Sequence, residues 1–264
     1  MNNFKYKKSL GQNFIQNDDI INQIVDNISI ESNDLIIEVG PGKGILTKGL
    51  KKFNANIIAY EIDPTLKPEL DLIVDNKTRI VYKDFLNADI LNDIKNIEYK
   101  NLFVVANLPY YITTPIIEKT INLKLPIHTM VLMVQKEVAE RLAATPGSKA
   151  YGSLTVYLNY YFEISKLFDV KKENFYPMPN VDSTVIKMER RKESFKVLNE
   201  PLFFKLVKDA FQQKRKTIKN NLKNYNLEII ESVLKNNKLS LNSRAEQINI
   251  AIFVAIANRL YSQK

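Results

Sequence analysis

The chain has 264 residues with no cysteine, one histidine and a net charge of +9, and its length suits one large domain or a large domain with a small one. Without cysteine, thiol nucleophiles, disulfides and Cys/His zinc sites are excluded, and we expect no bound metal. Because nothing resembles a signal peptide and no apolar run approaches the ~20 residues that span a bilayer, we expect a cytoplasmic protein without a membrane partner.

Five short apolar runs in the first half of the chain predict β-strands, because amphipathic helical patterns separate them. The runs are Leu35–Val39, Asn56–Tyr60, Arg79–Tyr82, Leu102–Val105 and Thr129–Val134. This alternation predicts an α/β fold with a mostly parallel sheet and helices on both of its faces. His128 directly precedes the fifth run, where a strand-edge residue is a better interpretation than a member of a Ser-His-Asp relay.

The rest of the chain is predicted to add two strands and a helical tail. Residues Leu154–Phe162 and Val181–Met188 resemble a late pair of strands around a loop that contains Pro177 and Pro179. In the tail, one helix face accounts for the spacing of the apolar residues Phe204, Val207, Phe211, Ile218 and Leu222.

Charge and glycine are distributed in opposite ways along the chain. Residues 187–264 hold 17 Lys and Arg against 7 Asp and Glu, whereas all 7 glycines precede residue 153. Two domains with different roles explain both distributions. We therefore expect a larger α/β domain over residues 1–190 and a small, basic, all-helical domain over residues 191–264.

A glycine-rich stretch directly after the first strand predicts a ligand-binding turn. It reads Glu38-Val-Gly40-Pro-Gly42-Lys-Gly44. Glycines let the backbone turn sharply and let a ligand approach without obstruction from Cβ atoms. The spacing fits neither the dinucleotide fingerprint nor the phosphate loop, and a turn without functional weight is the alternative for the motif alone.

Acidic residues at the ends of the next two strands add the other parts of a nucleoside site. Glu61, followed by Ile62, can accept hydrogen bonds from the two hydroxyls of a ribose. Asp84 offers a carboxylate for an exocyclic amine, and Phe85 offers a ring to cover a purine. Taken singly, each acidic residue is better explained as a helix cap. Together with the glycine turn they predict a site for an adenosine that has no pyrophosphate.

These motifs resemble the S-adenosylmethionine site of Rossmann-like class I methyltransferases, and Asn107-Leu108-Pro109-Tyr110 resembles the signature loop of those that methylate the exocyclic amine of adenine. As a whole, the chain resembles the ribosomal RNA adenine dimethyltransferase family, which modifies two adjacent adenosines near the 3′ end of small-subunit (16S) RNA. The matching segments are Leu10–Ile15, Asn107–Pro115, Phe175–Ser183 and Arg244–Glu246.

The resemblance implies S-adenosylmethionine as cofactor, 16S rRNA in the small subunit or its precursor as partner, and a monomer. It places Asn13 and Ile15 over the methionine end of the cofactor, while Glu38 is expected to shape the glycine turn. The expected cofactor site comprises Asn13, Ile15, Gly40, Gly42, Glu61, Ile62, Asp84, Phe85 and Asn107.

The residues after the fourth strand suit the chemistry of an aromatic amine, whose lone pair is delocalised into the ring. The side-chain carbonyl of Asn107 and the backbone carbonyl of Leu108 can accept hydrogen bonds from the amine and localise that lone pair. Pro109 fixes the turn, and Tyr110 can stack on the target base. By resemblance, Phe175 covers the opposite face of the base; the alternative is a core residue that anchors the proline-rich loop.

Clustered positive charge in the tail predicts contacts with RNA phosphates. The cluster consists of Lys214, Arg215, Lys216 and Lys219. A solvated helix face is the alternative for any one of these residues. Because the excess positive charge of the chain lies in this domain, we expect RNA binding.

Two other functions stay open on the sequence alone. A related branch of the family dimethylates large-subunit (23S) RNA and confers antibiotic resistance, but the stretch Thr145–Gly152 resembles the small-subunit branch. A non-catalytic ribosome-assembly or transcription factor would keep the fold without turnover. Intact Asn107, Pro109 and Tyr110 favour an enzyme.

Overall fold

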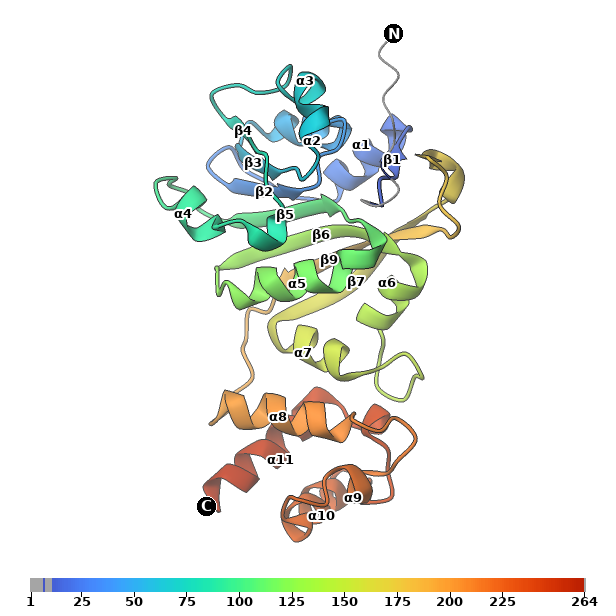
Figure 1. Ribbon diagram of the computed structural model, residues 1–264. Helices are drawn as coiled ribbons and strands as arrows, with labels where there is room; N and C mark the ends of the chain where they lie inside the picture. The colour runs from blue at the N-terminus through green and yellow to red at the C-terminus, as the bar shows by residue number, and fades with distance from the viewer. Residues whose placement is uncertain (1–6, 8–10, 264) are drawn as a thin grey trace. The chain divides into compact units, whose positions relative to one another are not determined.

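The computed structural model describes residue 7 and residues 11–263 (Figure 1). Leu10, which begins the expected amino-terminal motif, lies outside the described residues. The contacts divide the chain into two compact units, and each unit has its own hydrophobic core.

The sheet unit comprises Met1–Ala139 and Ser165–Glu189, and the helical unit comprises Glu140–Ile164 and Arg190–Lys264. This division differs in one respect from the predicted domains, which cover residues 1–190 and 191–264. Residues 140–164 pack with the helical unit rather than with the sheet unit.

A seven-stranded sheet forms the centre of the sheet unit, in the order β4-β3-β2-β5-β6-β9-β7. Its strands are β2 (Leu35–Val39), β3 (Asn56–Tyr60), β4 (Thr78–Val81), β5 (Leu102–Asn107), β6 (Ile127–Gln135), β7 (Phe162–Val170) and β9 (Ser183–Arg190). The pairs from β4 across to β6 are parallel, and β9 runs antiparallel to β6. The expected mostly parallel sheet is therefore confirmed.

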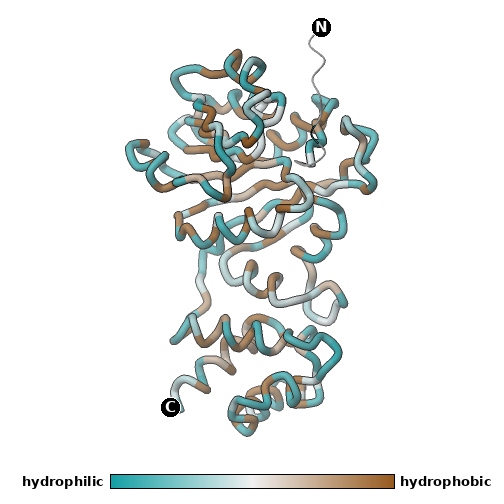
Figure 2. Tube along the Cα trace, in the orientation of Figure 1, coloured by the Kyte–Doolittle hydropathy of each residue, from teal (hydrophilic) through white to brown (hydrophobic). Residues whose placement is uncertain are grey.

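Helices cover this sheet, and its central strands are buried on both faces. The helices of the sheet unit are α1 (Asp18–Asp26), α2 (Ile45–Leu50), α3 (Lys67–Leu70), α4 (Ile90–Ile94) and α5 (Thr113–Asn122). Helix α6 (Lys136–Leu142) begins in this unit, and its residues from Glu140 on belong to the helical unit. Ile24 of α1 and Leu50 of α2 lie in one hydrophobic cluster with Ile36 and Phe103 of the sheet. Figure 2 shows apolar residues along the central strands. Burial on both faces explains why these strands are continuously apolar rather than alternating.

The strand order reverses between β2 and β5. From β2 the chain runs outward through β3 to β4, and it then returns to place β5 on the other side of β2. Val39 of β2 pairs with Ala106 of β5, so the loops after both strands leave the sheet at the same edge. Ligands of open α/β sheets bind at such a reversal.

A separate two-stranded antiparallel ribbon joins distant segments of the sheet unit. It consists of β1 (Phe14–Ile15) and β8 (Phe175–Tyr176), with Ile15 opposite Phe175. The ribbon therefore attaches the amino-terminal motif to the proline-rich loop.

The prediction of a strand over Leu154–Phe162 is wrong. Residues Ser153–Tyr161 form the helix α7, and strand β7 begins only at Phe162. The segment is rich in β-branched and aromatic residues, which favour strands. Val156 and Tyr160, four positions apart, are buried in the core of the helical unit, and this tertiary packing decides the conformation.

The helical unit packs its helices around one core. Besides α7 they are α8 (Glu200–Ala210), α9 (Ile218–Asn221), α10 (Leu227–Asn236) and α11 (Ile250–Ser262). Phe203, Leu206 and Phe253 are fully buried in this core.

The tail does not form one continuous helix across the expected apolar face. Helix α8 ends at Ala210, and residues 211–217 form a turn before α9. Asn221 donates its side-chain amide to the carbonyl of Ala210 at 2.6 Å, which satisfies a backbone acceptor at the helix end. Because residues 212–216 are all exposed, they contribute no apolar surface that would favour continuing the helix.

Candidate active site

A cavity lies where the strand order reverses, at the carboxyl ends of β2 and β5. It is partly open to solvent, and the space between its walls, including the open part, is about 770 Å³. Three segments line most of the cavity, namely residues 11–15, residues 40–46 except Gly44, and residues 107–110. The remaining lining residues are Glu61, Ile62 and Leu66. The structure therefore brings together Asn13, Ile15, Gly40, Gly42, Glu61, Ile62, Asn107, Leu108, Pro109 and Tyr110 of the predicted site.

The glycine turn forms one wall of the cavity in a backbone conformation that favours glycine. Gly42 has φ +58°, and a Cβ atom there would lie 2.7 Å from Cε1 of Phe14, closer than real contacts allow. The Gly42 N–H donates a hydrogen bond to Oε2 of Glu61 at 3.0 Å.

Glu61 follows β3 and is 4% exposed. Its two carboxylate oxygens accept hydrogen bonds from the backbone N–H groups of Gly42 (3.0 Å) and Asp63 (2.8 Å). Burial raises the pKa of Glu61, and these hydrogen bonds oppose that rise. A carboxylate accepts about four hydrogen bonds, so acceptor capacity remains on the cavity side. The oriented, buried Glu61 and the Cβ-free turn fit the ribose of S-adenosylmethionine.

Asn107 is the last residue of β5, and its amide group is held in one orientation. Its side-chain Nδ2 donates to the backbone carbonyl of Asn13 at 3.1 Å. Because a backbone carbonyl only accepts, this contact assigns the nitrogen to Asn13 and leaves Oδ1 as an acceptor. The Leu108 N–H donates to the Met133 carbonyl at 3.2 Å, which fixes the backbone at the next residue.

Tyr110 begins the 3₁₀ turn η5 (Tyr110–Ile112) and lines the cavity. Its ring is held in place at the hydroxyl end. Its hydroxyl lies 2.8 Å from Oγ of Ser183, the first residue of β9. Burial raises the pKa of Tyr110, so the phenol stays protonated at physiological pH. A neutral, half-buried ring with a fixed edge can offer one face to a base.

Three predicted site residues do not line the cavity. Phe175 is 3% exposed and lies in the hydrophobic core with Ile15, which is the alternative that the sequence left open. Asp84 caps the 3₁₀ turn η4 (Phe85–Asn87) by accepting from the Leu86 N–H at 2.9 Å. Phe85 is buried against Tyr60, with ring centroids 5.4 Å apart. These contacts do not test the expected roles of Asp84 and Phe85 at an adenine, which stay predictions.

Glu38 lies in β2 and does not line the cavity. Its side chain is fully buried, and neither carboxyl oxygen has a hydrogen-bond partner among the described residues. Burial raises the pKa of Glu38 to about 8.

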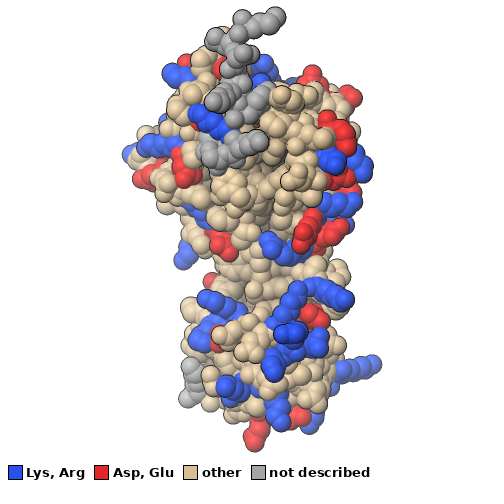
Figure 3. All heavy atoms as spheres, turned by 45° about the vertical axis from the view of Figure 1, so that its right-hand side comes forward, with Lys and Arg blue, Asp and Glu red and all other residues tan. Residues whose placement is uncertain are grey.

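The four predicted RNA-binding residues are exposed in the helical unit. Lys214, Arg215 and Lys216 lie in the turn between α8 and α9, and Lys219 lies in α9. Within the part of the chain that the structure describes, no carboxylate forms an ion pair with any of them. Figure 3 shows Lys and Arg side chains gathered on the visible face of this unit. Such cations are available to phosphates.

Two further kinds of site are absent from residues 7 and 11–263. Over these residues, no three His, Cys, Asp or Glu side chains are grouped so that they could hold a metal ion. None of the described helices has both the length and the apolar character that crossing a membrane requires.

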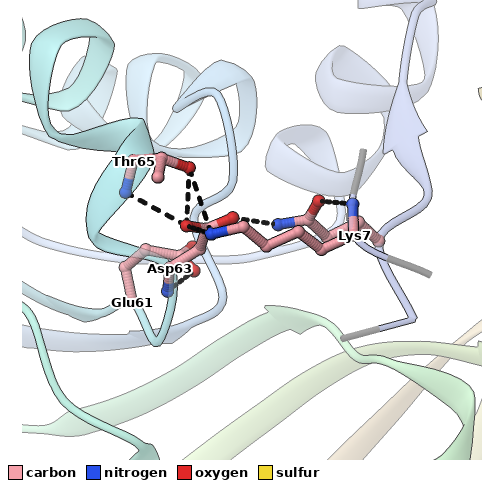
Figure 4. A network of polar contacts seen from close by, with 5 residues as sticks. Lys7, Glu61, Asp63 and Thr65 are labelled. Carbon is pink, nitrogen blue, oxygen red and sulfur yellow. Dashed lines mark hydrogen bonds and ion pairs between the residues drawn. The ribbon is translucent and has the colours of Figure 1, made fainter. Parts of the chain in front are cut away.

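Sequence reasoning missed Gln12 and Phe14, which lie inside the amino-terminal motif, and Asp63, which directly follows Glu61 and Ile62. Gln12 and Phe14 line the cavity, and Asp63 holds Gln12 through a hydrogen bond of 2.7 Å between Nε2 and Oδ2 (Figure 4). The signal that could have found them is their position inside the amino-terminal motif and directly after Glu61-Ile62.

Comparisons with known proteins agree with this geometry. The family model described as ribosomal RNA adenine dimethylase matches residues 3–262. A ribosomal RNA small subunit methyltransferase A from Bacillus cereus (strain B4264) is 41% identical over 99% of this chain and 93% of its own length. A relative from Bacillus mycoides with the same name is also 41% identical, over the same shares of both chains.

Solved structures show the same fold. A dimethyladenosine transferase from Plasmodium falciparum superposes with a TM-score of 0.74 at 27% identity, covering 92% of this chain and 95% of its own. The 23S rRNA methyltransferase ErmE has a TM-score of 0.75 at 24% identity, covering 94% and 100%, and shows the fold alone. The family resemblance inferred from the motifs is thus confirmed, and the chain belongs to the ribosomal RNA adenine dimethylase family, enzymes with the Rossmann-like class I methyltransferase fold.

Proposed function

We propose that this enzyme transfers methyl groups from S-adenosylmethionine to the exocyclic amines of two adjacent adenosines near the 3′ end of 16S rRNA, in the small subunit or its precursor. The observation that carries the proposal is the oriented Asn107 amide at the cavity. The substrate follows from the relatives named small subunit methyltransferase A and dimethyladenosine transferase.

In this proposal, the cofactor occupies the cavity between the amino-terminal motif and the glycine turn. S-adenosylmethionine supplies an electrophilic methyl group on a sulfonium. Glu61 accepts hydrogen bonds from the ribose hydroxyls, and Gly40 and Gly42 let the ligand approach the backbone. Asn13 and Ile15 close the end that holds the methionine part.

The target adenine enters beside Asn107. Oδ1 of Asn107 and the carbonyl of Leu108 accept hydrogen bonds from the amine, which favours the tetrahedral nitrogen of the transition state over the planar ground state. Tyr110 stacks on one face of the base. No strong base is needed, because the methylated amine becomes acidic and loses a proton afterwards. Because Phe175 is in the core, its proposed contact with the base requires the β1–β8 ribbon to expose it.

The helical unit supplies the phosphate contacts in this proposal. Lys214, Arg215, Lys216 and Lys219 neutralise backbone charge of the rRNA, which adds affinity without reading sequence. We further propose that the enzyme acts as a monomer in the cytoplasm, where ribosomal subunits are assembled.

The proposal is tested by methyl transfer from labelled S-adenosylmethionine to small and large ribosomal subunits isolated from cells that lack this protein. Labelled nucleosides are identified by mass. We expect dimethyladenosine in the small subunit only. Label in the large subunit would assign the enzyme to the 23S branch, and absence of label from both would contradict the proposal.

A further inference from the structure

Asp63 gathers polar groups from two distant parts of the sheet unit (Figure 4). Its side chain is fully buried, directly after β3 and Glu61. Oδ1 accepts hydrogen bonds from Nζ of Lys7 (2.6 Å) and from the N–H and hydroxyl of Thr65 (3.0 and 2.6 Å). Oδ2 accepts from Nε2 of Gln12 at 2.7 Å.

The same residue is linked to both sides of the cofactor cavity. The Asp63 N–H donates to Oε1 of Glu61 at 2.8 Å, and Gln12 is held at both ends, because its Oε1 accepts from the Lys7 N–H at 2.8 Å. Gln12 and Glu61 both line the cavity, whereas Asp63 does not. Asp63 thus touches the two walls from outside the site.

Helix capping explains only part of this arrangement. Asp63 caps the 3₁₀ turn η3 (Pro64–Leu66), and a cap needs only the bonds from Thr65. Burying a carboxylate is costly unless several groups bond to it, and here two of those groups, on Lys7 and Gln12, lie 56 and 51 residues earlier in the sequence. Burial would raise the pKa of Asp63, but the bonds from Lys7, Thr65 and Gln12 outweigh it and hold the pKa at about 2. The carboxylate is therefore charged at every physiological pH.

We propose that Asp63 is a positioning residue for the cofactor. It holds Gln12, in the lining segment 11–15, and the Glu61 carboxylate at the separation that S-adenosylmethionine requires. The inference rests on the proposed function, since it assigns that cofactor to the cavity. Asp63 contacts neither the reacting methyl group nor the amine, so its effect is on cofactor binding in the ground state and transition state alike.

The test compares Asp63→Ala and Asp63→Asn with the wild-type enzyme. Alanine removes every side-chain bond, whereas asparagine keeps the size and one oxygen but sets an NH₂ group against a donor, either the NH₂ of Gln12 or the ammonium group of Lys7. We expect the Kd for S-adenosylhomocysteine, measured by calorimetry, and the KM for S-adenosylmethionine to rise together by about tenfold, which corresponds to about 1.4 kcal/mol. The kcat at saturating cofactor should stay within about twofold.

Asp71→Asn is the matched control. Asp71 forms an ion pair of 3.0 Å with Lys67, four residues away on the sequence, and it does not line the cavity. This variant should leave the Kd, the KM and the kcat unchanged. Lys7→Gln breaks the ion pair but keeps the bonds from Gln12 and Thr65, so we expect a smaller rise in Kd than for Asp63→Ala.

A double-mutant cycle shows whether Asp63 acts through Glu61. If it does, the binding losses of Asp63→Ala and Glu61→Gln will not add, because the second change removes a group that the first has already displaced. Additive losses, an unchanged Kd in both Asp63 variants, or a fall in kcat at an unchanged KM would overturn the inference. Methyl transfer by the wild-type enzyme in the same assay keeps that outcome separate from failure of the proposed function.

Discussion

Asn107 shows how a single residue is prepared for its role by contacts far away in the sequence. Its Nδ2 is engaged by the carbonyl of Asn13, so the amide cannot rotate freely and Oδ1 keeps its direction. Preorganised acceptors contribute more to a reaction than flexible ones, since they need no rearrangement during the chemical step. The amino-terminal motif therefore orients the residue that we propose binds the amine, as well as lining the cavity.

The raised pKa of Glu38 leads to a prediction, also at the scale of one residue, of how the stability of the folded protein depends on pH. Its pKa of about 8 in the folded protein lies above its ordinary value of 4.5, so the folded state binds the proton more tightly. The stability that this proton contributes is complete below pH 4.5 and is lost as the pH rises toward 8. The loss is on the order of a few kcal/mol.

Glu38→Gln should remove this pH dependence, because an amide stays neutral throughout. The free energy of unfolding, measured with urea between pH 5 and 8.5, should fall less for the variant than for the wild type. Glu118→Gln, which changes an exposed carboxylate on α5, is the control and should keep the wild-type slope. Equal slopes for Glu38→Gln and the wild type would show that Glu38 is not protonated in the folded protein.

At the scale of elements, the α8–α9 turn places three of the basic side chains outside regular helix. Replacing Lys214, Arg215, Lys216 and Lys219 by Gln should weaken RNA binding and flatten its salt dependence. The slope of log K against log salt should become shallower by about 0.7 to 0.9 for every phosphate that the variant no longer neutralises. The measurement is a salt titration of rRNA binding by filter retention or fluorescence anisotropy.

A charge-matched control lies in the sheet unit. Lys48, Lys52, Lys95 and Lys100 are exposed there, and their replacement by Gln removes the same net charge. We expect the control to keep most of the wild-type slope. Equal slopes for the two quadruple variants would mean that bulk charge, rather than this turn, binds the RNA.

The helices and strands also show where local sequence patterns predict secondary structure correctly and where they do not. Strands β2 and β3 are found at the predicted residues, since continuous apolar runs between turns have one good interpretation in a parallel sheet. The prediction for residues 153–161 is wrong, because their β-branched and aromatic side chains favour a strand while burial in the helical core stabilises a helix. Packing partners that lie beyond position 200 decide the outcome.

At the scale of the whole molecule, topology explains how much of the site was predictable. Glu61 and the 107–110 loop were found because carboxyl ends of parallel strands meet at one edge. The link between Gln12 and Asp63 spans 51 residues, and no local pattern encodes it. Asp84 and Phe85 follow the same strand-end rule, and the structure adds a cap bond and a core contact, so their roles at an adenine stay predictions.

The central claim is that Asn107 localises the lone pair of the adenine amine at a cofactor site built by its neighbours. The most direct measurement is single-turnover methyl transfer to small subunits by the wild type and by Asn107→Ala, with the Kd for S-adenosylmethionine measured on the same preparations. We expect transfer to fall by about 10² or more, as when a preorganised transition-state hydrogen bond is removed, with the Kd within about threefold. A variant that binds cofactor and transfers methyl groups at a rate near that of the wild type would contradict the account.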